Sequence, residues 1–572
     1  MRTGDVMSSR RHEDALGAAT EVASAETARP RPHARLPAFT AWGVTVYGVA
    51  LAGLLLLSLR VTAGRLVYVL DDPAIHLSIA ENLADHGTWG VQAGHFQSAS
   101  SAPLWTLLLA VWIKLTPGSG TLAPLVLGAA ASVAIIAILG ATQQVLRPSL
   151  RRPLDALAVA ALVVVVLFLP SLAMVGMEHT LQAALVLGAV VAFHRRAGPP
   201  WLPYVLLVLA ALTRFETAFV AVGLAVAMLV TSPHDRRRPL GVLAAGLVPI
   251  AAFAAVNLAM GQGLLPNSVV AKTALNADAG EPLYREIPRR LTEDPLVAVL
   301  LAVLLVGLLV AWRDRGRAPG LVFPAVVYIV ATVLHVALAR VGWYERYQAY
   351  LIVLGVYAVL CMIAEVLPAS GTERDAAPSR GGQLPAAIVL VLLLFTWTKA
   401  ELTVQVREAV GETYQQRYQA GLFFERYYDG EPIATGELGY VTLFHDGPVT
   451  DFFGLGDHEV VEARRRFGQQ PPAEYWSDLA EQRRFQVVGV YPTTLFLDTP
   501  EHWIRVGTWE IDPGTITAWE PEFGFWVTRP EAVATLQANL REFEAELPPG
   551  VTLRLDELAE LRAAQLQAGS SP

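Results

Sequence analysis

Residues 41–59 read AWGVTVYGVALAGLLLLSL, an apolar run without a single charged side chain. A helix needs about 20 predominantly apolar residues to cross a bilayer core of about 30 Å. One run of this length could be a buried core helix, but similar runs follow it as far as Thr398. The series therefore predicts a polytopic α-helical membrane protein.

We expect eleven membrane spans in this region. After the first run they cover 121–146, 155–170, 178–195, 201–213, 215–231, 239–257, 296–312, 320–339, 345–366 and 384–398. The run LWTLLLAVWIKL at 104–115 is too short for a span, and we interpret it as an interfacial or re-entrant helix.

Composition supports this interpretation and excludes several functions. Of the 572 residues 53% are hydrophobic and 16% are charged, which is too apolar for an ordinary soluble enzyme. The formal charge of -8 arises mainly in the final third, and no basic stripe indicates a nucleic-acid partner. Cys361 is the single cysteine, so neither a disulfide framework nor a Cys-based metal site is expected. We expect no nucleotide or redox cofactor.

Three regions follow from these patterns. Residues 1–40 are rich in Arg, Ala, Ser and Pro and are expected to form a disordered cytoplasmic tail. The multi-pass transmembrane domain covers 41–399. Residues 400–572 mix β-rich runs, FQVVGVY and GFWVTR, with an amphipathic helix near Ala532–Leu547, which predicts a soluble α/β domain that covers the membrane site, binds an acceptor or is purely structural.

Arginine positions give the orientation. With eleven spans, every arginine cluster falls on one side of the membrane, as the positive-inside rule requires. These clusters are Arg29/Arg31/Arg35, Arg147/Arg151/Arg152, Arg195/Arg196, Arg236 to Arg238, Arg313/Arg315/Arg317 and Arg374/Arg380. The N-terminus is then cytoplasmic, and the loops 60–120, 171–177, 258–295 and 340–344 share the outer side with the C-terminal domain.

The first outer loop contains VYVLDDPAIHLSIAENLADHGTWG at 67–90. Pro73 suits the first turn of an amphipathic helix, with Asp72 as its N-cap and Gly87 as its stop. Adjacent acids at a membrane surface are costly without a purpose. Capping could explain Asp72 alone, but it leaves Asp71 unexplained.

We expect Asp71 to act as a general base on an acceptor hydroxyl, with Asp72 orienting it or helping to hold a divalent cation. On this interpretation Asp71→Asn abolishes activity. Asp72→Asn should do less, because an amide still caps a helix.

Further polar groups lie on the same predicted side. They suit a sugar joined to a lipid phosphate, because fixed cations can neutralise the phosphate as it leaves. The candidate donor-phosphate ligands are Lys272, Arg346, Arg214 and Asn267, and Arg340 lies in the same outer loop as Arg346. The candidate acceptor-binding or supporting residues are His76, Glu178, His179 and Glu216. A salt-bridged or snorkelling side chain is the alternative for each one.

The chain resembles the GT-C superfamily of polyprenyl-phosphate-sugar glycosyltransferases. The segments that carry the resemblance are DDPAIHLSIAENL at 71–83, SSAPLW at 100–105, GMEHTL at 176–181, LLPNSVVAK at 264–272 and ATGELGYVTLFHDGPVTDFFGL at 434–455. They are most similar to bacterial cell-envelope arabinofuranosyltransferases and mannosyltransferases. The resemblance implies a polyprenyl-phosphate-linked sugar donor, a cell-envelope glycan or other acceptor, Asp71 as the base, and Mg²⁺ or Mn²⁺ as the cation.

Two other functions fit parts of the sequence. A transporter or flippase would also need many spans and charges within them. However, no pair of Gly/Pro-broken helices occupies equivalent halves, and the polar residues gather on one face. A non-catalytic scaffold that binds glycans would not need the acidic pair.

Overall fold

The computed structural model describes residues 38–142, 153–274, 283–313, 319–366, 383–468, 470–492, 498–512 and 514–569. Most of the predicted tail lies outside these residues. The same is true of the arginine clusters at 147–152 and 374–380 and of Arg315 and Arg317.

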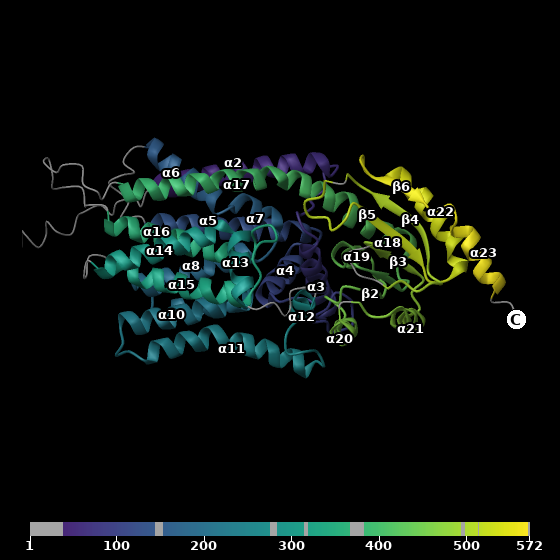
Figure 1. Ribbon diagram of the computed structural model, residues 1–572, viewed down its shortest axis with the longest axis horizontal. Helices are drawn as coiled ribbons and strands as arrows, with labels where there is room; N and C mark the ends of the chain where they lie inside the picture. Colours follow the sequence, from purple (N-terminus) through teal and green to yellow (C-terminus); the bar gives the residue numbers. More distant parts are fainter. Residues whose placement is uncertain are drawn as a thin grey trace, which may run out of the picture.

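Helices dominate the first two thirds of the described chain. They are α2 (Ala38–Val61), α3 (Asp72–His86), α4 (Pro103–Leu115), α5 (Ala123–Thr142), α6 (Pro153–Val166), α7 (Leu169–Val175), α8 (His179–Arg195), α9 (Leu202–Thr213), α10 (Thr217–Thr231), α11 (Arg237–Ala259), α12 (Asn267–Ala274), α13 (Leu283–Glu293), α14 (Pro295–Arg313), α15 (Pro319–Leu338), α16 (Ala349–Val366) and α17 (Gln383–Thr413). Figure 1 shows the long helices running side by side along the longest axis of the molecule.

Each of the eleven predicted spans overlaps a described helix, and the span at 155–170 covers α6 and the start of α7. Among the described residues, six spans are both long and apolar enough to cross a membrane, namely those in α2, α5, α6 with α7, α11, α14 and α15. Large apolar side chains on these helices, such as Leu56, Val248 and Leu309, are more than 60% exposed. Such exposure is unfavourable in water and favourable against lipid. This is a helical membrane protein, and the other five spans stay predictions.

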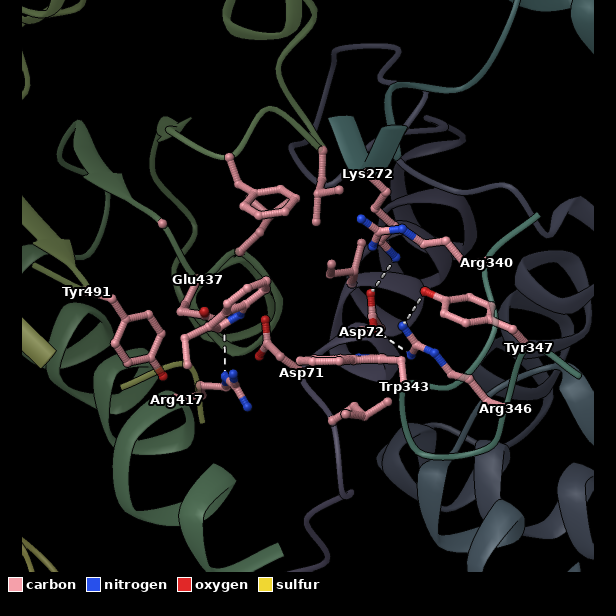
Figure 2. Close-up of a pocket in the computed structure, with 17 residues that line it drawn as sticks. Asp71, Asp72, Lys272, Arg340, Trp343, Arg346, Tyr347, Arg417, Glu437 and Tyr491 are labelled. Carbon is pink, nitrogen blue, oxygen red and sulfur yellow. Dashed lines mark hydrogen bonds and ion pairs between the residues drawn. The ribbon is translucent and has the colours of Figure 1, made fainter. Parts of the chain in front are cut away.

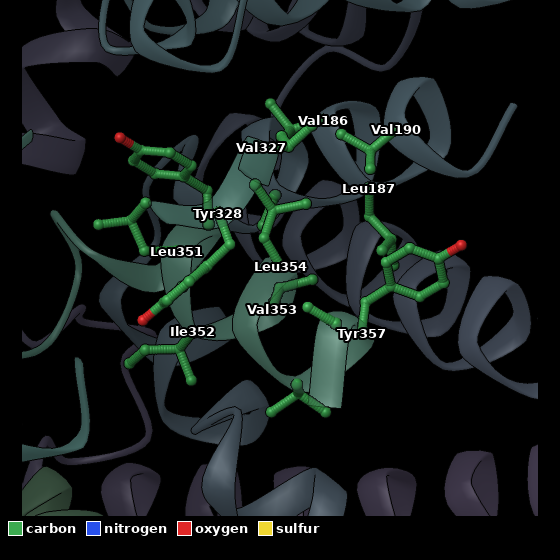
Figure 3. Close-up of a cluster of buried hydrophobic side chains, with 14 of the residues drawn as sticks. Val186, Leu187, Val190, Val327, Tyr328, Leu351, Ile352, Val353, Leu354 and Tyr357 are labelled. Atoms are coloured by element: carbon green, nitrogen blue, oxygen red, sulfur yellow. The ribbon is translucent and has the colours of Figure 1, made fainter. Parts of the chain in front are cut away.

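The core of the helical region lies where α8, α15 and α16 meet. Figure 3 shows Val186, Leu187 and Val190 of α8 against Val327 of α15 and Leu354 of α16. All five side chains are at most 2% exposed. Because neighbouring helices pack around α16, the start of this helix fixes the end of the loop that precedes it.

Two predicted boundaries were wrong. The loop expected at 171–177 is mostly helical, because Pro170 sits in the first turn of α7, where a proline needs no hydrogen-bond donor. The span expected from residue 345 begins only at Ala349. Glu345 and the three residues before it have left-handed φ angles that a right-handed α-helix does not contain.

A six-stranded sheet builds the C-terminal domain at one end of the helices. Its strands are β1 (Ile433–Thr435), β2 (Val449–Asp451), β3 (Val487–Val490), β4 (Ile504–Glu510), β5 (Glu522–Val527) and β6 (Thr552–Leu555), in the order β2-β1-β3-β5-β4-β6. Strands β1, β2 and β3 are parallel, and the remaining pairings are antiparallel. Its helices are α18 (Gln419–Tyr428), α19 (Gly439–Phe444), α20 (His458–Phe467), α21 (Ala473–Arg483), α22 (Val533–Phe543) and α23 (Ala559–Gly569). The predicted mixed α/β character is confirmed.

The predicted outer segments meet at this same end. Asp72 of α3 contacts Lys272 of α12 and Arg346 of the loop before α16. Asp71 contacts Gly439 of the C-terminal domain. Segments that were assigned to one side from the arginine pattern therefore lie together, and Figure 1 shows α3, α4 and α12 next to the domain.

Candidate active site

A cavity of about 340 Å³ lies between the helical region and the C-terminal domain. Its wall combines four cations, three carboxyl groups and five aromatic rings (Figure 2). The lining residues are Leu70, Asp71, Asp72, Ile75, Lys272, Arg340, Trp343, Arg346, Tyr347, Arg417, Gly436, Glu437, Leu438, Phe453, Leu455, Tyr491 and Trp519. Of the ten predicted site residues, four line this cavity: Asp71, Asp72, Lys272 and Arg346.

Asp71 is fixed by backbone groups of the C-terminal domain. The amides of Gly439 and Tyr440, in the first turn of α19, donate to its two carboxylate oxygens at 2.6 and 3.0 Å. A side chain at position 439 would collide with Asp71, so this close approach requires glycine. Burial raises the pKa of Asp71, although Arg417 and the two amides oppose the rise. A buried carboxylate with a raised pKa is a better proton acceptor than a solvated one.

Asp72 forms a charged cluster with two predicted ligands. Its Oδ2 accepts from Arg346 at 2.6 Å, and its Oδ1 accepts from Lys272 at 3.2 Å. Burial alone would raise the pKa of Asp72, but Arg346 and Lys272 hold it well below its usual range. Asp72 therefore stays ionised and orients both cations.

The predicted capping of α3 was half right. The helix begins at Asp72, so Asp71 occupies the N-cap position, and its side chain makes no capping bond. The assignment of Asp72 as N-cap was wrong, because its carboxylate is directed to Lys272 and Arg346 instead. The stop at Gly87 is confirmed by a left-handed φ of 67°.

Sequence reasoning missed the pair formed by Arg417 and Glu437. Arg417 lies in a π-helical turn, Tyr414–Tyr418, between α17 and α18, and such turns are frequent at functional sites. Its Nε donates to Glu437 at 2.9 Å and its Nη2 to the Thr517 carbonyl at 3.0 Å. Burial raises the pKa of Glu437 to about 8, against the opposing effect of Arg417. Glu437 can thus exchange a proton near neutral pH.

The domain's share of the cavity follows from its topology. Glu437, Phe453 and Tyr491 come from segments that directly follow β1, β2 and β3. These strands are parallel, and the chain passes from β1 to β2 on one side and then to β3 on the other. Ligands commonly bind at such a switch point, outside the carboxyl ends of the strands. The domain thus supplies about half of the residues that line the cavity.

Five predicted residues form a separate buried cluster outside the cavity lining. Arg214 donates to Glu178 at 2.7 Å and also binds Glu216. The ring of His76 lies 3.8 Å from Glu178, and His179 lies 4.0 Å from it. The cluster reaches the cavity through Tyr347, whose ring faces the guanidinium groups of Arg214 and Arg346 at 5.5 and 4.9 Å.

The tenth predicted residue, Asn267, joins the two halves of the molecule. It begins α12, donates to Gln262 at 3.3 Å and accepts from His458 of α20 at 3.1 Å when that ring nitrogen is protonated. Since α12 also carries Lys272, this bridge helps to set the position of a cavity cation.

The acidic pair does not fit a divalent cation. Mg²⁺ and Mn²⁺ need several oxygen ligands. Both oxygens of Asp72 already face cations, and both oxygens of Asp71 accept amide hydrogens. Within the described ranges, no three His, Cys, Asp or Glu side chains gather as a metal site. We therefore derive no step through a metal.

Comparison with known proteins gives likenesses of low sequence identity. Crystal structures of ArnT from Cupriavidus metallidurans, in the apo state and bound to undecaprenyl phosphate, are both 14% identical to this chain, with TM-scores of 0.47 and 0.48. Each similarity covers 86% of this chain and 98% of ArnT. An oligosaccharyltransferase from Archaeoglobus fulgidus is 13% identical, with a TM-score of 0.40, over 84% of this chain and 74% of its own.

No curated protein matches the sequence. Residues 404–530, which include every cavity residue from Arg417 to Trp519, match a family described as a domain of unknown function (DUF8728).

Proposed function

We propose that this protein is a membrane glycosyltransferase that moves a sugar from a polyprenyl phosphate to an extracytoplasmic glycan, lipid or protein acceptor. The observation that carries the proposal is the position of Asp71 in a cavity together with Lys272, Arg340, Arg346 and Arg417. The cavity offers a proton acceptor beside several fixed cations, which are the two elements that this transfer requires.

The chemistry assigns one role to each element. The acceptor hydroxyl transfers its proton to Asp71, and its oxygen forms a bond to the anomeric carbon of the donor sugar. The bond between that carbon and the phosphate oxygen breaks, and its electron pair leaves with the polyprenyl phosphate. Attack opposite the leaving phosphate inverts the anomeric centre.

The charges favour this pairing of base and leaving group. With Glu437 mostly protonated at neutral pH, the four cations of the wall outnumber the two aspartate carboxylates. During transfer the phosphate gains one negative charge while Asp71 loses one. The net charge inside the cavity is therefore unchanged, and little reorganisation of the surrounding dipoles is needed.

A transporter or flippase remains the alternative function. In its favour are the many helices, but the cavity that collects Asp71, Asp72 and four cations is lined on one side by the folded C-terminal domain. A transfer assay separates the two functions. Purified protein in nanodiscs should move labelled arabinose or mannose from polyprenyl phosphate to a cell-envelope glycan and release the lipid phosphate, whereas a flippase would leave the donor intact.

Lys272→Met is expected to weaken binding of polyprenyl phosphate by roughly tenfold to a hundredfold, because a charge-assisted hydrogen bond is lost. The Lys272 side chain is 27% exposed, and Arg346 still neutralises Asp72 when the lysine charge is removed, so the fold should be preserved. Binding of the labelled lipid to protein in nanodiscs measures the change. Lys114→Met, which removes an exposed lysine that does not line the cavity, is the matched control. Equal affinity in the two variants would remove Lys272 from the phosphate site.

We also propose that the C-terminal domain faces outward and the N-terminus faces the cytoplasm, on the strength of the arginine pattern. In a Cys361→Ala background, Ala545→Cys should react with an impermeant maleimide added to right-side-out membrane vesicles. Ser232→Cys, between α10 and α11, should react only after the vesicles are opened. Both positions are exposed. The reverse labelling pattern would invert the orientation.

A further inference from the structure

Two tryptophans of the cavity are incompletely covered by protein. Trp343 is 41% exposed and Trp519 is 44% exposed, whereas the cavity rings Tyr347 and Tyr491 are at most 7% exposed. Their ring centres lie 5.5 Å apart with planes inclined by 36°, and Phe453 lies 6.2 Å beyond Trp519. The helical region thus presents one large apolar face, and the C-terminal domain presents another beside it. Such a facing pair in a cavity suits a ligand with an apolar surface.

The backbone that presents Trp343 is strained. Gly342, Trp343, Tyr344 and Glu345 have φ angles of 83°, 48°, 60° and 62°, four successive residues in the left-handed region. Residues other than glycine adopt left-handed φ angles only at an energetic cost, and such strain clusters at functional sites. The turn is therefore maintained by its surroundings.

Polar contacts hold this turn on both sides. The Gly342 amide donates to Gln348 at 3.0 Å, and Gln348 donates to Glu345 at 2.9 Å. Glu345 is paired with Lys399 of α17, and the Tyr344 hydroxyl donates to the Leu402 carbonyl at 3.1 Å. Trp343 is thus the exposed member of a well-anchored turn, and Figure 2 shows it between Asp71 and Arg346.

The segment that carries Trp519 is equally well anchored. The carboxylate of Glu412, at the end of α17, accepts from the amides of Ile516, Thr517 and Ala518 at 2.6, 2.7 and 3.0 Å. On the other side of the tryptophan, Gln416 donates to the Glu520 and Pro521 carbonyls at 3.1 and 2.7 Å. An exposed aromatic on a mobile loop would lose conformational entropy when it binds a ligand, and a fixed one avoids this cost.

From this geometry we infer that Trp343 and Trp519 form the binding surface for the sugar ring of the lipid-linked donor. The inference deepens the proposed function and depends on it. A sugar ring has an apolar face made of C–H groups, which suits the face of an indole. Its anomeric carbon is bonded directly to the phosphate oxygen, so the ring must lie next to the phosphate.

The loop before α16 supplies both neighbouring sites. Arg340, Trp343 and Arg346 all line the cavity within a few residues of one another. With the phosphate at the cations, the ring lies on Trp343 with its anomeric carbon directed to Asp71. Trp519 then limits the size of the ring from the side of the C-terminal domain.

Binding of lipids with and without a sugar tests the inference. The probes are polyprenyl phosphate and its arabinofuranose-, mannose- and glucose-bearing forms, each titrated against wild-type protein in nanodiscs. The wild type should bind at least one sugar-bearing form more tightly than the bare lipid. Trp343→Ala and Trp519→Ala should each reduce that preference by roughly tenfold and leave affinity for the bare lipid unchanged. Trp343→Phe should retain most of the preference.

Trp312→Ala is the matched control, since this tryptophan of α14 is 81% exposed and does not line the cavity. A preference that survives both cavity substitutions, or a wild type without any preference, would overturn the inference. An equal loss of affinity for bare and sugar-bearing lipid would also overturn it, because the tryptophans would then support only the phosphate site or the fold. If the wild type binds no polyprenyl phosphate at all, the proposed function itself fails.

Discussion

Asp71→Asn is expected to reduce the rate of sugar transfer by roughly 10²- to 10⁴-fold, the contribution of a positioned general base. The substitution preserves shape but removes the proton acceptor. Asparagine has one acceptor oxygen for the two amides of Gly439 and Tyr440, so a stability loss of about 1–2 kcal/mol should accompany it. Donor binding should persist, because Lys272, Arg340 and Arg346 are unchanged.

Transfer of labelled sugar from polyprenyl phosphate, measured across a range of pH, checks this expectation. Because the base must be ionised, the wild-type rate should fall as the pH drops through the raised pKa of Asp71. The residual rate of Asp71→Asn should not show this decrease at low pH. Asp556→Asn is a suitable control. Like Asp71, Asp556 accepts a hydrogen bond from a backbone amide, that of Leu558, but it pairs with Arg562 and does not line the cavity.

Glu437→Gln makes the comparison sharper. Glutamine can still accept from Arg417, and a Glu437 carboxyl with a pKa of about 8 is largely uncharged at neutral pH, so the substitution removes little charge and the fold around the cavity should survive. If Glu437→Gln loses more activity than Asp71→Asn, then Glu437 is the base. If Asp71→Asn retains near-normal turnover and Glu437→Gln does too, base catalysis in this cavity is wrong and a transporter becomes the better interpretation.

Asp72→Asn should destabilise the folded protein by roughly 3 kcal/mol, since it removes one partner from a buried ion pair. The Arg346 side chain is only 1% exposed and would lose its carboxylate partner, whereas Lys272 can turn to solvent. The sequence-based expectation of a mild effect assumed that Asp72 caps α3, which the structure contradicts. Thermal unfolding in detergent measures the change.

The double variant Asp72→Asn/Arg346→Gln tests the cause. Removing both charges leaves no unpaired buried ion, so most of the lost stability should return, while sugar transfer should stay low because a cavity cation is missing. If the single variant is as stable as the wild type, or if the second substitution restores no stability, the ion pair does not hold this part of the cavity together.

The sequence predicted the helices well because each apolar run is a local signal. The ends of the helices were harder to predict. Pro170 lies in the first turn of a helix instead of ending one, and the turn at 342–345 depends on contacts with Gln348 and Lys399, which are not local signals. Asp71 and Asp72 stood out because two adjacent acids follow a span. Their roles could not be assigned from local order, because Asp71 is fixed by amides about 370 residues later in the chain.

Glu437 and Arg417 were missed for a related reason. In the sequence they look like ordinary charges of a solvated domain, yet both are less than 10% exposed. The π-helical turn around Arg417 has no clear sequence signal. The best available clue for Glu437 was its position just after a short β-type run, where parallel strands place ligand-binding residues.

The bond between Asp71 and α19 also sets the order in which the protein becomes competent during its synthesis. Ribosomes make the acidic pair early and the Gly439–Tyr440 amides only after all the membrane helices have been made. Until the last third of the chain has emerged and folded, Asp71 has no fixed direction and half of the cavity wall is missing. If Asp71 is the base of the proposed transfer, a nascent or truncated chain cannot transfer sugar, and activity begins only once the C-terminal domain has folded.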